Sequence, residues 1–210
     1  MAGDLPQGLR WYPGWLSAER QRALVAEVAL LLEQAPLYRP AMPKSGKPLT
    51  VTMSNAGSLG WIADVTGYRY QAHHPITGRP WPAIPATILA IWEELSNFPA
   101  PPEACLINRY EATARMGLHR DADEAALAAP VLSLSLGDSA LFRIGGPERR
   151  DPTRSFRLHS GDVLLLGGAS RRCYHGVDRI LAGSSRLLAD GGRLNLTLRR
   201  VTHPEPRSSH

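Results

Sequence analysis

The sequence predicts a mainly β fold, an antiparallel sandwich or jelly roll with α-helices packed on its outside. Apolar residues recur every three to four positions in only two segments, and both lie within the first hundred residues. After residue 100 the apolar pattern changes to a period of two, in short segments separated by turn residues. Evenly spaced short strands without intervening helices are typical of such folds. At 210 residues, 43% of them hydrophobic, the chain suits one domain with a sizeable core.

The first predicted helix follows Ser17, whose hydroxyl can cap it, and ends before Pro36. Its apolar face consists of Leu24, Val28, Leu31 and Leu32. A second helix is expected from Pro85, which suits the start of a helix, to the region of Asn97. Between the helices, Gly and Pro interrupt every periodic run, so residues 38–85 are predicted to form loops and short strands.

The strands are expected in the second half of the chain, where apolar and polar residues alternate. They are Ala104–Tyr110, Val131–Leu136, Ala140–Ile144, Ser155–Leu158, Val163–Leu166, Cys173–Val177 and Arg193–Arg200. Seven strands of this length can form two packed sheets, with the two helices on the outside. A polar tail after Thr202 is expected to fray.

The composition excludes several classes of protein. Two cysteines, Cys105 and Cys173, cannot form a disulfide framework or a four-thiolate metal site, so a reducing cytoplasm is the expected location. No segment is long and apolar enough for a membrane span, and the start of the chain lacks the pattern of a signal peptide, so we expect a soluble, unexported protein. The 24 Lys and Arg against 19 Asp and Glu give a net charge of +5, a weak indication of a polyanionic partner.

A histidine and a carboxylate two residues apart, His119 and Asp121, suggest a metal site. On a strand, residues i and i+2 share a face about 6.6 Å apart, so both side chains can reach one ion. His175 supplies a third ligand from a predicted core strand. Two histidines and one carboxylate leave three octahedral positions open, which suits Fe(II) that binds a co-substrate and O₂. A catalytic zinc ion also takes three protein ligands, so these residues alone leave both metals open.

The last predicted strand favours iron. Its alternation places Arg193, Asn195, Thr197 and Arg199 on one face and three leucines on the other. Many half-exposed strands have such a polar face. However, arginine suits bidentate recognition of carboxylates, and the two arginines, about 20 Å apart along the strand, can lean toward opposite ends of a dicarboxylate. A dioxygenase that uses 2-oxoglutarate needs such a pair of arginines, whereas a hydrolytic zinc site does not.

Several ordered segments carry a family resemblance. They are Leu59-Gly60-Trp61, Pro80-Trp81-Pro82-Ala83, Asn108-Arg109-Tyr110, Leu118 to Glu124, Val131 to Gly137, Gly145-Gly146, Gly161-Asp162-Val163, Tyr174-His175-Gly176 and Arg193 to Arg199. Together they resemble the AlkB family, the bacterial Fe(II)/2-oxoglutarate-dependent dioxygenases of alkylated nucleic acid. The resemblance extends from the first helix to Arg200. It implies one dioxygenase domain over 1–210 with a double-stranded β-helix (jelly-roll) core at 101–203, helices and nucleotide-recognition loops at 1–100, and a tail at 204–210.

The resemblance also implies roles for individual residues. The iron ligands would be His119, Asp121 and His175. The residues that hold 2-oxoglutarate would be Asn108, Tyr110, Arg193, Asn195 and Arg199, with Arg193 on the distal carboxylate and Arg199 nearer the iron. The expected reaction is oxidative demethylation of bases such as 1-methyladenine and 3-methylcytosine, which consumes O₂ and releases formaldehyde, succinate and CO₂. A hydroxylase of a protein or small molecule with the same cofactors is the alternative.

On the substrate side, the resemblance implies that Trp61 stacks on the flipped base and that Tyr68 and Tyr70 contact the nucleic-acid backbone. Asp123 would face the same pocket and accept a hydrogen bond from the exocyclic amine of the base, or else lie in a solvated acidic turn with Glu124. Arg149 matches a substrate contact of the family. Phosphates could also meet surface pairs such as Arg171-Arg172. The expected partner is single- or double-stranded alkylated DNA, with RNA as a further candidate, and we expect a monomer and no membrane.

Overall fold

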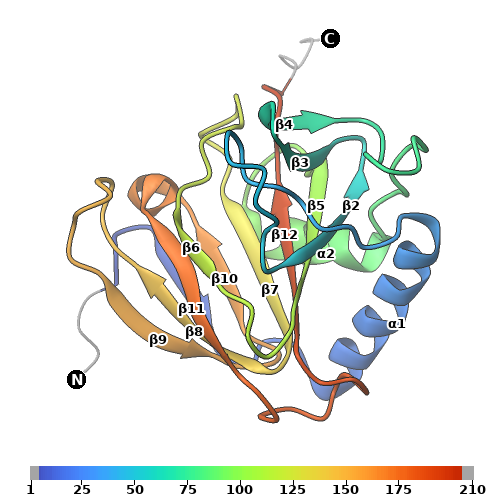
Figure 1. The fold of residues 1–210 in the computed structure, drawn as a ribbon. Helices are drawn as coiled ribbons and strands as arrows, with labels where there is room; N and C mark the ends of the chain where they lie inside the picture. Colours follow the sequence, from blue (N-terminus) through green and yellow to red (C-terminus); the bar gives the residue numbers. More distant parts are fainter. Residues whose placement is uncertain (1–4, 205–210) are drawn as a thin grey trace, which may run out of the picture.

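The computed structural model describes residues 5–204 and contains two packed antiparallel sheets, with helices on the outer face of the larger one (Figure 1). In the first hundred residues the elements are β1 (Leu9–Tyr12), α1 (Ala18–Gln34), β2 (Thr52–Gly57), β3 (Gly60–Asp64), β4 (Gly67–Gln71) and α2 (Ala86–Ser96). They are followed by β5 (Ala104–Tyr110), β6 (Met116–His119), β7 (Val131–Gly137), β8 (Ser139–Ile144), β9 (Arg154–Leu158), β10 (Val163–Leu166), the 3₁₀ helix η1 (Gly168–Arg172), β11 (His175–Leu181) and β12 (Arg193–Arg199). The expected mainly β fold with flanking helices is confirmed.

The larger sheet has the strand order β1-β10-β7-β12-β5-β2. Its outer face is covered by the helices, whose buried residues Leu24, Val28, Leu31, Ile88, Ile91 and Trp92 join the leucines of β12 in one hydrophobic cluster. Both helices begin and end close to the expected positions. The Ser17 hydroxyl accepts the first-turn N–H of Arg20, and Asn97 ends α2 in the left-handed conformation at φ 50°.

The smaller sheet has the order β6-β11-β8-β9 and faces the inner side of the larger sheet (Figure 1). A second hydrophobic cluster fills the space between the sheets, with Met53, Leu106 and Tyr110 from the larger sheet and Phe142, Ile144 and Val177 from the smaller. The candidate active site lies beside this cluster, between the two sheets. A separate hairpin of β3 and β4 lies next to it.

Several strand boundaries differ from those expected. The sequence pattern missed β1, and β2 was expected only as part of an interrupted region, yet both strands extend the larger sheet. The strand expected at Cys173–Val177 begins at His175, because residues 168–172 form the 3₁₀ helix that precedes it. The larger sheet therefore draws on the first hundred residues as well as on 101–203. The tail from residue 205 lies outside the described residues.

No helix within residues 5–204 combines the length and the apolar character needed to cross a membrane. Both cysteines are free and buried.

Candidate active site

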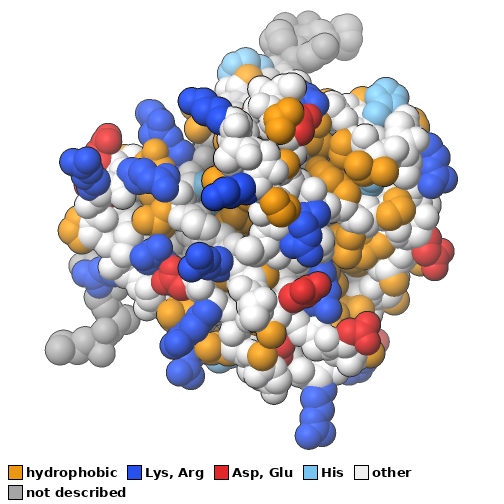
Figure 2. Space-filling view, in the orientation of Figure 1, with side chains coloured by type: hydrophobic (Ala, Val, Ile, Leu, Met, Phe, Trp, Pro, Cys, Tyr) orange, Lys and Arg blue, Asp and Glu red, His pale blue; other side chains and the backbone are white. Residues whose placement is uncertain are grey.

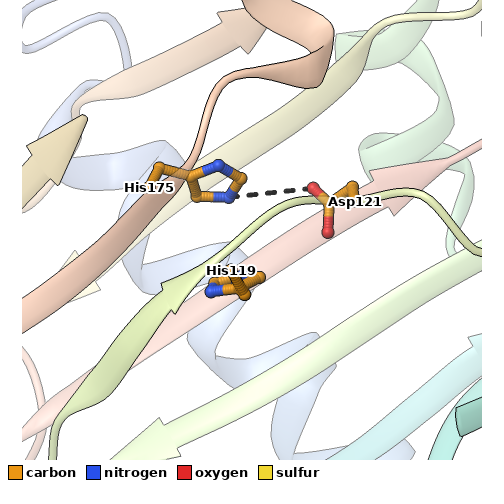
Figure 3. Close-up of side chains that lie close together, drawn as sticks. All are labelled: His119, Asp121 and His175. Carbon is orange, nitrogen blue, oxygen red and sulfur yellow. Dashed lines mark ion pairs between the residues drawn. The ribbon is translucent and has the colours of Figure 1, made fainter. Parts of the chain in front are cut away.

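Two neighbouring strands and the loop after one of them bring His119, Asp121 and His175 together (Figure 3). His119 ends β6 and is paired directly with His175 at the start of β11, with their ring centroids 4.5 Å apart. Asp121 lies just beyond β6, not on the strand as the simple i, i+2 argument assumed. One potential ligand atom from each residue lies within 4.8 Å of the other two. The sequence-predicted triad therefore converges on a volume suited to one metal ion.

Both histidines are held so that one ring nitrogen is available for a metal. Nδ1 of His119 donates to the carbonyl of Gly117, and Nδ1 of His175 donates to the carbonyl of Cys173, each at 3.0 Å. A carbonyl oxygen can only accept, so Nδ1 carries the proton and Nε2 keeps its lone pair. Such bonds orient metal-binding imidazoles and fix their tautomer. Nε2 of His175 lies 3.8 Å from Oδ2 of Asp121.

The charges around the triad favour the metal-binding protonation states. Burial alone would raise the pKa of Asp121, but Arg199, and then His175 and His119, outweigh burial and hold that pKa below its ordinary value. Burial, followed by His119, lowers the pKa of His175 to about 4. The carboxylate is therefore charged and His175 is neutral near pH 7. Oδ2 of Asp121 is buried and has no hydrogen-bond partner among the described residues, which fits an oxygen that awaits a cation.

The register of β12 and β5 gathers the residues expected to hold 2-oxoglutarate. Arg193 is paired with Tyr110, and Asn195 with Asn108. All seven residues of β12 are buried, so its polar face lines the space between the sheets and is not solvated. This outcome favours the site interpretation of the alternating pattern over that of a half-exposed strand.

The two arginines of this face present free donors to that space. Nε and Nη1 of Arg193 and Nε and Nη1 of Arg199 are buried without hydrogen-bond partners within residues 5–204. Nη2 of Arg193 donates to the Ser135 hydroxyl at 2.8 Å, and Nη2 of Arg199 donates to Oδ1 of Asp121 at 2.8 Å. Buried guanidinium groups with unused donors are costly unless an anion binds them. The arrangement fits a dicarboxylate such as 2-oxoglutarate.

The two paired asparagines, Asn108 on β5 and Asn195 on β12, differ in how many of their side-chain atoms have hydrogen-bond partners. Nδ2 of Asn195 donates to the Ser133 hydroxyl and to the Leu134 carbonyl, while its Oδ1 accepts from Thr197. Asn195 is thus largely bonded within the sheet. Oδ1 of Asn108, in contrast, is buried without a partner in the described part of the chain. Burial raises the pKa of Tyr110 to about 12, so its hydroxyl remains a hydrogen-bond donor near pH 7.

The β3–β4 hairpin brings the predicted substrate residues beside the metal triad. Trp61 is paired with Tyr70 across the hairpin, and its indole stacks on Tyr68 with centroids 5.4 Å apart and planes 19° apart. The indole N–H of Trp61 donates to Oδ2 of Asp123 at 2.9 Å. Tyr68 and Asp123 are exposed, whereas Tyr70 is half-buried and donates its hydroxyl to Glu124. Burial raises the pKa of Tyr70 above its ordinary value, so this hydroxyl stays protonated.

Two exposed arginines, Arg120 and Arg149, lie near the triad. Arg149 donates to the carbonyl of Leu118, next to His119 of the triad, at 2.9 Å. The guanidinium groups of Arg120 and Arg149 lie 5.5 Å and 5.7 Å from the centroid of the Tyr174 ring. Lys and Arg side chains are also frequent on the part of the surface formed by the smaller sheet (Figure 2). A local excess of positive charge thus lies beside the metal ligands.

The sequence interpretation missed two buried residues, Glu124 and Arg171. Arg171 was considered as a surface contact for phosphate, but its side chain is 2% exposed and donates to the carbonyls of Asp121 and Ala129 as well as to Glu124. Glu124 is not part of a solvated turn, because its side chain is also 2% exposed. The only sequence signal for either was proximity, since Glu124 follows the H-x-D pair and Arg171 lies four residues before His175.

Comparisons with known proteins agree with this geometry. Residues 8–199 match the model of the 2OG-Fe(II) oxygenase superfamily. An alpha-ketoglutarate-dependent dioxygenase AlkB homolog of Caulobacter vibrioides (strain NA1000 / CB15N) is 56% identical over 196 residues, which are 92% of this chain and 88% of that protein. The alpha-ketoglutarate-dependent dioxygenase AlkB of Escherichia coli (strain K12) is 39% identical over 186 residues, 87% of this chain and 85% of the relative.

A solved structure of OsALKBH1 superimposes with a TM-score of 0.79 at 30% identity, and the match covers 94% of this chain and 99% of that one. The jelly-roll assignment is thereby confirmed, and Fe(II), 2-oxoglutarate and O₂ are the metal and co-substrates that this site serves. Residues 8–199 match the family model, and the alignments with the two AlkB relatives cover at least 85% of both chains. The chain therefore belongs to the 2OG-Fe(II) oxygenase superfamily and, within it, to the AlkB family.

Proposed function

We propose that this chain repairs alkylated nucleic acid by oxidative demethylation of N-methylated bases such as 1-methyladenine and 3-methylcytosine. The observation that carries the proposal is the convergence of a His-Asp-His triad, two buried arginines with free donors, and an aromatic hairpin on one volume. Bound together, Fe(II) and 2-oxoglutarate supply the oxidation of a methyl group by O₂, with succinate and CO₂ as by-products. The hydroxymethylated nitrogen then releases formaldehyde and the repaired base.

The residues of this chain would bind and orient the reactants. His119, Asp121 and His175 hold the metal. Arg193, with Tyr110 and Asn108, receives the distal carboxylate of 2-oxoglutarate, and Arg199 with Asn195 completes the wall nearer the metal. These assignments follow the free donors and acceptors of the buried face, because each buried polar atom needs a partner.

The substrate base is proposed to lie against Trp61, with Asp123 within reach of its exocyclic amine and the exposed Tyr68 in contact with the nucleic-acid backbone. Asp123 already fixes the indole of Trp61 by a hydrogen bond, and both side chains retain exposed surface. A methylated adenine or cytosine ring that carries a positive charge is attracted by an aromatic face and a carboxylate. Tyr70, which was expected to contact the nucleic-acid backbone, instead fixes the hairpin, because its half-buried hydroxyl donates to Glu124. Arg149 and Arg120, stacked on Tyr174, are placed to meet phosphates.

We further propose that the substrate is single- or double-stranded DNA, with RNA as a second nucleic acid to be tested, and that the chain acts as a cytoplasmic monomer. Two buried free thiols are compatible with a reducing compartment. Light scattering would give a mass near 22.9 kDa for a monomer, and twice that value would contradict it.

The decisive experiment is mass spectrometry of a single-stranded oligonucleotide that carries one 1-methyladenine or 3-methylcytosine. The oligonucleotide is incubated with protein, Fe(II), ascorbate, O₂ and 2-oxoglutarate, and the His119→Ala variant is the matched control. Loss of the mass added by one methyl group, with wild type only, supports the proposal. Succinate without repair would instead favour a hydroxylase of a protein or small molecule. If neither succinate nor repaired base is formed, the assignment as a dioxygenase is refuted.

A further inference from the structure

A buried network of four charged side chains surrounds the metal ligand Asp121. Arg199 donates to Oδ1 of Asp121, and its Nε lies 3.4 Å from Oε1 of Glu124. Arg171 donates to Oε2 of Glu124 at 3.0 Å and to the backbone carbonyl of Asp121 at 2.6 Å. All four side chains are at most 7% exposed. Two positive and two negative charges balance, which is the condition under which such groups are tolerated in a protein interior.

Glu124 is the member of this network that reaches beyond it. Its Oε1 accepts the hydroxyl of Tyr70, which lies on β4 of the substrate hairpin. The neighbouring Asp123 accepts the indole N–H of Trp61 from β3. Because Trp61 and Tyr70 are directly paired, two adjacent carboxylates receive the two halves of the same hairpin. Both oxygens of Glu124 are therefore occupied by protein groups, so Glu124 has a different task from that of a substrate contact.

We propose that Glu124 is a positioning residue that orients Arg199 toward 2-oxoglutarate and connects it, through Tyr70, to the β3–β4 hairpin, so that 2-oxoglutarate and nucleic acid bind cooperatively. The proposal rests on the proposed function and assigns a specific role to a residue that touches neither reactant. When the hairpin is held against Glu124, the Arg199 guanidinium is restrained from two sides, by Asp121 and by Glu124. A ligand that favours the contact between Tyr70 and Glu124 then strengthens binding of the other ligand, and the coupling is reciprocal.

The test uses Tyr70→Phe, which removes one hydroxyl, and Glu124→Gln, which keeps the shape and removes the charge. Tyr68→Phe is the matched control, because Tyr68 lies two residues away on the same strand and has an exposed side chain. The dissociation constant of 2-oxoglutarate is measured by calorimetry on Fe(II)-loaded protein under argon, where turnover cannot occur. We expect it to rise about tenfold in Glu124→Gln, a typical effect of losing a supporting contact, and less in Tyr70→Phe. Tyr68→Phe should leave it unchanged.

A second measurement separates positioning from mere stabilisation. The affinity for a methylated oligonucleotide is compared with and without 2-oxoglutarate, again under argon with Fe(II). Wild type should bind more tightly with 2-oxoglutarate, and Tyr70→Phe should lose that difference while its unfolding midpoint stays near that of wild type. In aerobic kinetics at saturating oligonucleotide, the KM for 2-oxoglutarate should rise in Tyr70→Phe by a larger factor than kcat falls.

Wild-type 2-oxoglutarate affinity in both Tyr70→Phe and Glu124→Gln would overturn the proposal, even if either variant is less stable. If Glu124→Gln does not fold, the 2-oxoglutarate affinity of Tyr70→Phe alone tests the proposal. A wild-type protein that binds no 2-oxoglutarate would overturn the proposed function and this inference with it, whereas normal wild-type binding with unaffected variants would overturn only the inference.

Discussion

The two arginines of β12 lie on the same face of one strand, yet their charges are balanced differently. Arg199 contacts two carboxylates, Asp121 and Glu124, and although burial alone would lower its pKa, these groups and Tyr70 raise it above the ordinary value. Arg193 forms no ion pair with any described residue, and burial lowers its pKa to about 10. The charge of Arg199 is thus balanced by the protein itself, although its Nη1 still has no hydrogen-bond partner among the described residues. The Arg193 end is completed only when an anion binds from outside.

This difference indicates that Arg199 and Arg193 have different roles in the site. A buried ion pair that lies next to the metal ligands keeps the site in one arrangement before any reactant binds. A buried cation without a counter-ion destabilises the empty protein and gains most from a bound carboxylate. Each of the following substitutions tests one side of this comparison, from the largest expected effect to the smallest.

Asp121→Ala should abolish turnover, because it removes the only carboxylate of the metal triad and one of the two acids that face Arg199. Equilibrium dialysis should show that Fe(II) no longer binds tightly, and succinate production should fall to the level without enzyme. Asp178→Asn, which alters only a partly exposed ion pair with Arg143, is a suitable control. Retention of Fe(II) affinity in Asp121→Ala would show that the carboxylate is not a ligand.

Arg199→Ala should weaken 2-oxoglutarate binding and also destabilise the protein. Removing the guanidinium leaves Asp121 and Glu124 close together in a buried site with only Arg171 as a counter-charge. Loss of one partner of a buried pair costs about 3–5 kcal/mol of unfolding free energy. Denaturant titration measures the stability, and calorimetry measures the affinity. If 2-oxoglutarate bound to this variant as it does to wild type, Arg199 would not belong to the co-substrate site.

Arg193→Met should separate the two effects. We expect the free energy of 2-oxoglutarate binding to weaken by about 2–5 kcal/mol, the usual range for truncating one partner of a buried charge pair. The stability of the empty protein should change little, since Met fills similar space without a charge, and only the hydrogen bond to Ser135 is lost. A loss of stability as large as that of Arg199→Ala would contradict the comparison.

The pH dependence of stability should also show the unpaired charge. The folded pKa of Arg193, about 10, lies below the ordinary value of an unfolded arginine, so the folded protein releases this proton first. The unfolded state then binds more protons, and the contribution of Arg193 to stability rises with pH above about 10. Below that pH the buried charge of Arg193 lowers the free energy of unfolding by an amount that does not change with pH. The difference in unfolding free energy between wild type and Arg193→Met should therefore shift in favour of wild type as the pH rises above about 10.

Saturating 2-oxoglutarate should reduce that pH dependence, because a bound carboxylate keeps Arg193 charged in the folded state. A pH-independent difference between wild type and Arg193→Met would mean that the side chain is already neutralised within the protein.

Much of the fold and of the site could be predicted from local pattern. Ala104–Tyr110 and Val163–Leu166 match the observed strands, since their alternation or apolar run reflects burial directly. Strand β2 could not be predicted in the same way, because its Ser54 and Asn55 are fully buried polar residues. Ser54 bonds to the carbonyl of Ala35, and Asn55 bonds to the backbone of Trp61. Partners so placed are visible only in three dimensions.

The buried pair of Glu124 and Arg171 was hidden for the same reason. A charged residue is rarely buried unless it is paired, and here the partners are 47 residues apart in sequence. The sequence therefore left a solvated turn open for Glu124 and suggested a surface position for Arg171. The structure shows that both residues are buried, with Arg171 bonded to Glu124 and to the backbone of Asp121.

By itself, the sequence predicted the residues of the metal triad. It also determined the face of β12 on which both arginines lie, because strand alternation is a property of the local backbone. Only the tertiary structure decided that Arg199 is paired and Arg193 is not. The carboxylate that binds Arg199 comes from a loop 78 residues earlier, and packing of the two sheets alone brings it there. Local covalent geometry decides which way a side chain points, whereas the charge it meets depends on chain segments that are distant in sequence.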